Sequence, residues 1–239
     1  MTSLTQFLRE NAKFALDEKR TLNQSIWKKD HIIPEVKTAL LKIADAFIAF
    51  VGSKDMKVVD IVVTGSLANY TWHSKSDVDL HIMVEVPNTK YKDSLLELFS
   101  AKKSLWNAEH EVEIKGFPVE LYIQPTTEKH ASSGVYSLKS DKWITLARKS
   151  HPSIDDAYVI RKADNWKRKI DDLITHNSNN SAAIESFKKR LRDIRKMALD
   201  KDGEYAVENL AFKILRNDGY IKKLYDYSLA LKDAQLSLK

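Results

Sequence analysis

The chain has 239 residues, of which 30% are charged and 43% are hydrophobic, and it carries a formal net charge of +6 with no cysteine. This balance is typical of a folded soluble protein, and the length suffices for one large domain or two closely associated ones. The lack of cysteine excludes disulfides, thiolate zinc sites and a cysteine nucleophile.

The beginning of the chain, residues 1–20, carries charges throughout and has no apolar core like that of a signal peptide. No apolar run approaches the roughly 20 residues of a membrane span. We therefore expect a cytoplasmic protein with no membrane contact. The positive charge favours polyanionic partners such as nucleotides or nucleic acid, although evenly spread Lys and Arg more often mean only a solvated surface.

The first elements in chain order are helical. Residues 1–30 are predicted to form one or two short helices. A clearer helix is predicted to begin at Pro34, a favoured first-turn residue, and to end at Gly52. Its apolar residues recur at steps of three and four, as the inward face of a helix requires: Val36, Leu40, Ile43, Phe47 and Phe50.

Two strands are predicted next. Residues 58–63 are β-branched and mostly apolar, Gly65-Ser66 interrupts them, and Leu67-Ala68 can begin a short helical turn. Residues 77–86 alternate between apolar and polar side chains, as in a half-buried strand.

The remaining pattern predicts a helix over 90–107, a hairpin of strands 111–115 and 119–124, a short strand over 135–138, and then helices only. The helix over 90–107 is expected to bury Leu95, Leu96, Phe99 and Leu105. The later helices are predicted over 154–175, 181–199, 204–217 and 220–235.

Two aspartates open the alternating strand. Because side chains alternate along a strand, Asp77 and Asp79 share one face, about 7 Å apart at the backbone. Ionised carboxylates this close repel one another unless a cation lies between them. Hard oxygen ligands on a rigid strand suit Mg²⁺, and one such pair can provide ligands for two ions about 3.5–4 Å apart. The alternative is a pair of surface acids.

The Gly-Ser pair adds a second feature to this pattern. Gly65 lets the backbone approach a triphosphate closely, and Ser66 with nearby amides can bond a phosphate oxygen. The alternative for Ser66 is an ordinary turn residue. A third acid would complete the metal site and help to deprotonate an attacking hydroxyl.

The segment GSLANYTWHSKSDVDL resembles the signature of the polymerase-beta-type nucleotidyltransferase superfamily. That signature has a hydrophobic strand, Gly-Ser or Gly-Gly, about a dozen residues, and then Asp-x-Asp between hydrophobic residues. The match covers roughly residues 55–125 in motif and order. The segments GVYS and ENLAFKILR also resemble stand-alone nucleotidyltransferases predicted in bacteriophages.

The resemblance implies an α+β fold. Residues 1–150 would contain the N-terminal helices and a mixed β-sheet flanked by helices. An all-helical lobe would follow over residues 151–239. The active site would lie in the cleft between these two parts. It also implies a third acid on a nearby strand. Glu120 in VELYI matches that position best, although most family members have an aspartate there, and Glu113 on the partner strand is the alternative.

The implied reaction is transfer of a nucleoside monophosphate from an NTP, such as ATP, to an acceptor hydroxyl with release of pyrophosphate. Asp77, Asp79 and Glu120 would hold Mg²⁺ (or Mn²⁺), and Gly65 and Ser66 would bind the nucleotide. The acceptor stays open among an RNA 3′ end or other nucleic acid end, a second nucleotide, a protein side chain and a small molecule. The alternative function is a non-catalytic nucleotide-binding or toxin-neutralising module of the same fold.

The densest basic stretch lies in the helix predicted to end near Leu199. On a helix, four of its cations share one side: Lys188, Arg192, Arg195 and Lys196. Such a face is most often simply solvated, and contact with a nucleic acid backbone is the alternative.

Overall fold

A computed structural model describes residues 19–52, 56–128, 130, 132–149, 155–175 and 180–238. The chain divides into two compact units, and among the described residues the first covers 19–149 and the second 155–238. The first unit contains a mixed sheet and two long helices, and the second is helical in its described part. The α+β class predicted from the sequence is confirmed.

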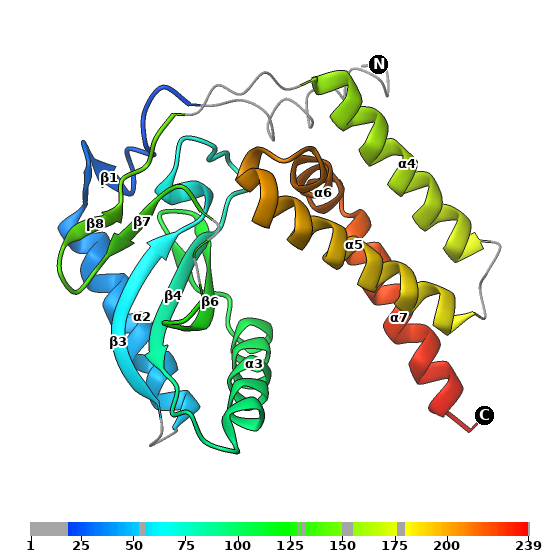
Figure 1. Ribbon diagram of the computed structural model, residues 1–239, viewed down its shortest axis with the longest axis horizontal. Helices are drawn as coiled ribbons and strands as arrows, with labels where there is room; N and C mark the ends of the chain where they lie inside the picture. Colours follow the sequence, from blue (N-terminus) through cyan, green and yellow to red (C-terminus); the bar gives the residue numbers. More distant parts are fainter. Residues whose placement is uncertain are drawn as a thin grey trace. The chain divides into compact units, whose positions relative to one another are not determined.

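A six-stranded mixed sheet forms the centre of the first unit, in the order β5-β6-β4-β3-β7-β8 (Figure 1). Its long central strand β4 (Val78–Glu85) lies between β3 (Lys57–Thr64), which is antiparallel to it, and β6 (Phe117–Pro125), which is parallel. The shorter strands are β5 (Glu113–Ile114), β7 (Val135–Ser137) and β8 (Lys142–Thr145).

The helix α2 (Pro34–Val51) has the bounds predicted from the sequence. Gly52 ends it in the left-handed conformation, with φ of 64° and its N–H donated to the Ile48 carbonyl. Its buried residues follow one stripe: Val36, Leu40, Ala44, Phe47 and Val51.

The helix α3 (Lys92–Glu109) joins β4 to β6, because two parallel strands require a crossover of this kind. It buries Phe99 and Trp106, which are two turns apart on one stripe. The prediction that Leu105 points inward is wrong, since Leu105 is 46% exposed. The neighbouring Trp106 takes the inward position instead.

Alternation along β4 separates the core from the polar face. Val78, Leu80, Ile82 and Val84 are fully buried and belong to the same apolar cluster as Leu40 and Phe47 of α2 and Leu121 of β6. The residues between them therefore project from the other face of the sheet, where the acidic side chains lie.

The helices predicted within residues 1–30 fall largely outside the described residues. Among those described, residues 19–33 contain no helix but two short antiparallel strands, β1 (Trp27–Lys28) and β2 (His31–Ile32). Trp27 stacks on Trp143 of β8, with ring centroids 4.8 Å apart. This segment is therefore held to the sheet by aromatic packing.

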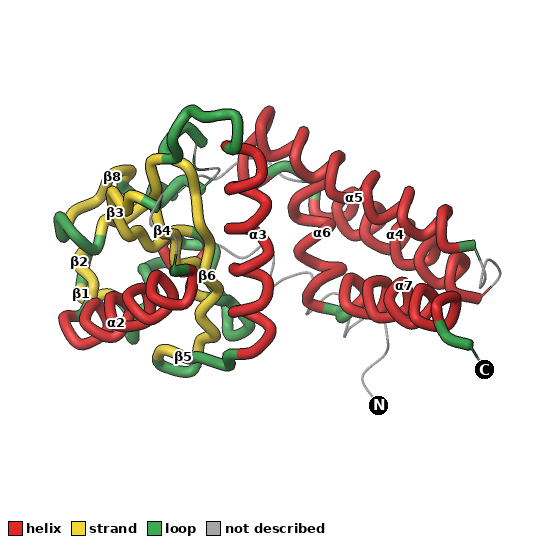
Figure 2. Tube along the Cα trace, turned by 90° about the horizontal axis from the view of Figure 1, so that it is seen from below, coloured by secondary structure: helices red, strands yellow, loops and turns green. Residues whose placement is uncertain are grey.

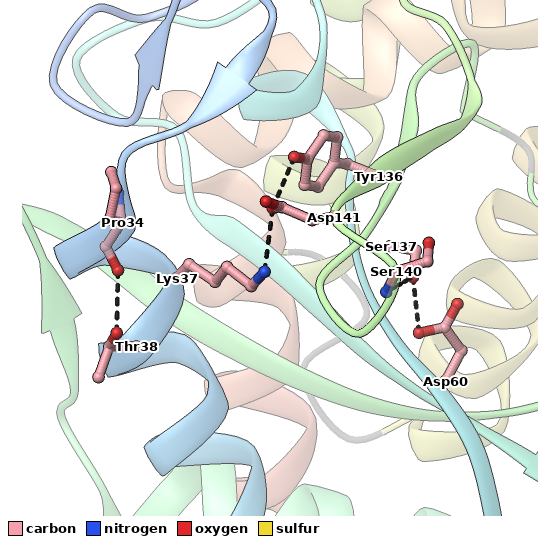
Figure 3. Close-up of polar contacts among 8 residues, drawn as sticks. All are labelled: Pro34, Lys37, Thr38, Asp60, Tyr136, Ser137, Ser140 and Asp141. Carbon is pink, nitrogen blue, oxygen red and sulfur yellow. Dashed lines mark hydrogen bonds and ion pairs between the residues drawn. The ribbon is translucent and has the colours of Figure 1, made fainter.

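A polar link joins the β7–β8 turn to α2, as Figure 3 shows. The hydroxyl of Tyr136 donates a hydrogen bond of 2.8 Å to Asp141, and Asp141 forms an ion pair of 3.1 Å with Lys37. Tyr136 itself is fully buried. These contacts connect β7 and the β7–β8 turn to α2 within the first unit.

The second unit packs α4 (Asp156–Thr175), α5 (Ser181–Asp202), α6 (Val207–Asn217) and α7 (Tyr220–Leu236) around one apolar cluster (Figure 2). Asn180 caps α5 by accepting the Ala183 N–H at 2.9 Å. None of the helices in the described part of the chain has the length and hydropathy needed to cross a membrane.

The basic stretch of α5 is not a continuous solvated face. Lys188 is buried, and its ammonium contacts Glu185 at 2.9 Å and the Ser228 hydroxyl at 3.1 Å. Arg195 donates from Nε to the side chain of Asn209 at 3.0 Å. Two of the four cations thus hold α5 to its neighbours, which weakens the case for a nucleic acid contact along this side.

Candidate active site

Three acidic side chains from two adjacent strands meet on the polar face of the sheet. Asp79 in β4 lies beside Glu120 in the parallel strand β6, and Asp77 directly precedes β4. One oxygen of each carboxylate lies within 4.8 Å of the others, and all three residues are partly buried. Among the described residues, these three carboxylates form a group close enough to share a metal ion.

Glu113, the alternative third acid, is not part of this group. It lies exposed in β5, opposite Pro118, near the start of β6. Parallel pairing places Glu120 directly beside Asp79, so Glu120 is the acid that the fold brings to the aspartates.

Gly65 makes room for the Asp79 carboxylate. Its backbone has φ of 72° and ψ of −160°, a conformation that is essentially restricted to glycine. A Cβ added at this position would lie 1.7 Å from Asp79 Oδ2, far closer than atoms can approach. The Asp79 side chain therefore rests directly against the Gly65 backbone.

Ser66 begins a 3₁₀ helix (Ser66–Ala68) and is tied to the residue before the aspartates. Its hydroxyl donates to Ser76 Oγ at 2.9 Å, and the same oxygen accepts the His73 N–H at 3.0 Å. Ser76 is buried, so this pair fixes the loop between β3 and β4 next to Asp77. Sequence reasoning missed Ser76, although its position directly before Asp77 is a usable signal.

Tyr122 is a second residue that sequence reasoning missed. Its hydroxyl donates a hydrogen bond of 2.8 Å to Glu120 Oε2. Burial, followed by the negative charge of Glu120, raises the pKa of Tyr122 well above its ordinary value. The phenol therefore stays protonated and keeps its role as a donor. The sequence did contain a signal for this contact, because Glu120 and Tyr122 are two residues apart on a strand and therefore share a face.

His81 follows Asp79 on the same face of β4 but is not part of the acidic group. Its Nδ1 is 2.6 Å from Gln124 Oε1, and because an amide oxygen only accepts, this nitrogen carries the proton. Burial lowers the pKa of His81 to about 4. The neutral ring therefore packs within the sheet and lies outside the acidic group.

The buried His81 should make the fold sensitive to mild acid. The unfolded pKa is 6.5 and the folded pKa is about 4, so stability that is present above pH 6.5 is lost as the pH falls toward 4. Near pH 5 the loss amounts to roughly 2 kcal/mol. We expect the fall in melting temperature between about pH 7 and about pH 5 to be smaller in His81→Gln than in the wild type.

The matched control for this measurement is His31→Gln, because the His31 side chain is 67% exposed. His31→Gln should lose as much melting temperature on acidification as the wild type. If His81→Gln and the wild type respond to acid equally, His81 does not carry the effect.

The donor set of the acidic group fits a hard divalent cation. It consists only of carboxylate oxygens, which Mg²⁺ and Mn²⁺ prefer, and it contains no sulfur or imidazole ligand. Three carboxylates held this close repel one another, and a cation between them would offset that repulsion. The residues present therefore suit such an ion.

Comparison with known proteins identifies the domain to which this site belongs. The family model described as "Nucleotidyltransferase domain" matches residues 40–193. A search of curated proteins gives no match. Among solved structures, the STING-associated CdnE c-di-GMP synthase from Capnocytophaga granulosa is similar at 11% identity, with 92% of this chain and 87% of that chain covered and a TM-score of 0.25. A likeness this distant carries no argument about substrate.

Proposed function

The chain belongs to the nucleotidyltransferase family, and we propose that it transfers a nucleoside monophosphate from an NTP to an acceptor hydroxyl with release of pyrophosphate. The observation that carries this proposal is the meeting of Asp77, Asp79 and Glu120, whose oxygens lie within 4.8 Å of one another. The family match, over residues 40–193, covers all three residues.

In this proposal Asp77, Asp79 and Glu120 hold Mg²⁺ or Mn²⁺. When bound, such an ion neutralises charge on the triphosphate and lowers the pKa of an attacking hydroxyl. Glu120 also accepts or helps to accept the proton of that hydroxyl. Its Oε2 accepts the Tyr122 hydrogen bond. The protein contributes mainly position and electrostatics, as is usual for attack at phosphorus.

Gly65 and Ser66 are the proposed nucleotide-binding residues. The absence of a side chain at Gly65 lets the Asp79 carboxylate rest directly against the backbone, so a phosphate bound through an ion on Asp79 would lie next to the Gly-Ser turn. Ser66 lies at the start of the adjacent 3₁₀ helix, and on nucleotide binding its hydroxyl would exchange its hydrogen bond to Ser76 for one to a phosphate oxygen. This arrangement supports a triphosphate seated between the Gly-Ser turn and the aspartates.

The test of this function is product formation from labelled NTPs. The protein is incubated with each NTP and Mg²⁺ or Mn²⁺, alone and with RNA, a second nucleotide, a protein mixture or small hydroxyl compounds. We expect pyrophosphate release that stops with EDTA, and the size of the labelled product identifies the acceptor. Nucleotide binding without pyrophosphate under every condition would instead favour a non-catalytic nucleotide-binding or toxin-neutralising module.

The identity of the third acid is tested by a pair of matched variants. Glu120→Gln keeps the size of the side chain but removes its charge, so we expect the rate of nucleotidyl transfer to fall by about 10²-fold. Glu113→Gln makes the same change on the neighbouring strand and should leave the rate within about twofold of wild type. If Glu113→Gln is the variant that loses activity, the assignment of Glu120 is wrong.

A further inference from the structure

A neighbouring side chain orients Glu120 of the acidic group directly. Tyr122 follows it by two residues on β6 and projects from the same face of the sheet. The Tyr122 hydroxyl donates to Glu120 Oε2 at 2.8 Å, a short bond to a carboxylate. One oxygen of Glu120 is thereby held in place by a residue of its own strand.

The ring of Tyr122 is itself fixed by its surroundings. Its centroid lies 4.8 Å from the His81 ring of the adjacent strand, and the ammonium of Lys103 on α3 lies 4.7 Å from it. His81 is in turn bonded to Gln124 at 2.6 Å. Packing on both neighbours leaves the phenol few alternative rotamers, so the direction of its hydroxyl is set in advance.

The hydrogen bond from Tyr122 opposes the electrostatic repulsion among the three carboxylates of the acidic group. Glu120 and the two aspartates repel one another, and an unrestrained glutamate would turn away from them toward solvent. A hydrogen bond from a neutral donor stabilises the ionised carboxylate where it stands. Partners of this kind around metal ligands commonly alter metal affinity by about 10- to 100-fold.

We propose that Tyr122 is a positioning residue that holds Glu120 in the orientation needed to bind the divalent metal. The proposal rests on the proposed function, because it takes Glu120 to be a metal ligand. Tyr122 itself touches neither metal nor substrate in this account. Its effect passes entirely through the Glu120 carboxylate.

The test measures Mn²⁺ binding to the full chain directly, by the loss of the free-ion paramagnetic resonance signal. Tyr122→Phe removes the hydroxyl and keeps the ring on His81 and Lys103. We expect it to weaken Mn²⁺ affinity by about tenfold. Tyr136→Phe is the matched control, because Tyr136 also donates a 2.8 Å hydrogen bond to a carboxylate, that of Asp141. It should bind Mn²⁺ within about twofold of wild type, even if its melting temperature falls.

A second measurement separates positioning from general damage to the fold. The Mg²⁺ concentration that gives half-maximal pyrophosphate release should rise about tenfold in Tyr122→Phe, and saturating metal should restore most of the turnover. Glu120→Gln should not be restored in this way.

Equal Mn²⁺ affinity in Tyr122→Phe and the wild type, with the wild type active, would overturn this inference and leave the proposed function intact. Loss of affinity in Tyr136→Phe as large as that in Tyr122→Phe would also overturn it. A wild type that neither binds Mn²⁺ nor releases pyrophosphate would overturn the proposed function and this inference with it.

Discussion

Asp77→Asn and Asp79→Asn should each lower the rate of nucleotidyl transfer by about 10³-fold or more. A metal ion contributes several kcal/mol of transition-state stabilisation, and each 1.4 kcal/mol corresponds to about tenfold in rate. Asparagine keeps the shape of the side chain but lacks the negative charge that the cation requires. The measurement is pyrophosphate release at saturating NTP and Mg²⁺, together with the melting temperature of each variant.

The fold should survive both substitutions, because each removes a charge from a group of mutually repelling carboxylates. The melting temperature should therefore stay at or above that of the wild type. Asp45→Asn on the exposed side of α2 is the matched control and should keep wild-type activity. If Asp77→Asn and Asp79→Asn retain full activity, neither aspartate takes part in the chemistry.

Gly65→Ala is the second substitution with a large expected effect. The new methyl group would occupy the position of Asp79 Oδ2, which lies 1.7 Å from an added Cβ, so the carboxylate must move. Misplacing a catalytic group by about 1 Å can cost about 10²-fold, and the methyl group also obstructs the approach of a phosphate. We expect the rate of pyrophosphate release to fall by about 10³-fold in total.

Backbone strain also contributes to the Gly65→Ala effect, and a second glycine separates strain from displacement. Gly116 has a positive φ of 82°, but an added Cβ there meets no atom within 4 Å. Gly116→Ala should therefore lower the melting temperature, since such strain costs about 1–3 kcal/mol, while keeping wild-type turnover. If Gly116→Ala loses as much activity as Gly65→Ala, strain rather than the position of Asp79 explains the loss.

The resemblance carried by the Gly-Ser turn and Asp-x-Asp is confirmed by the family match, and the α+β class is confirmed by the sheet and helices. Both could be predicted because the relevant signals are local. Strand alternation assigns Asp77 and Asp79 to one face, and Gly52 and Pro34 mark the ends of α2.

The sequence favoured Glu120 as the third acid, but its local pattern did not exclude Glu113. Glu113 and Glu120 both lie in short alternating segments, and only the parallel register between β4 and β6 decides which one meets Asp79. Such non-local pairing is set by the crossover through α3 and the packing of the core, not by the residues around either glutamate.

Side-chain partners were the other features that sequence alone did not reveal. Tyr122 and Ser76 have roles that depend on rotamers and on contacts of a few ångströms. Lys188 was predicted to lie on a basic face, but its ammonium is buried in the helical unit and contacts Glu185 and Ser228. Charge and spacing cannot distinguish a solvated lysine from a buried one with partners.

Anomalous scattering from crystals grown with Mn²⁺ and a non-hydrolysable NTP analogue tests the central claim most directly. We expect an anomalous peak in contact with carboxylate oxygens of Asp77, Asp79 and Glu120, next to the triphosphate and the Gly65 backbone. An ordered nucleotide with no anomalous peak among these three carboxylates would contradict it.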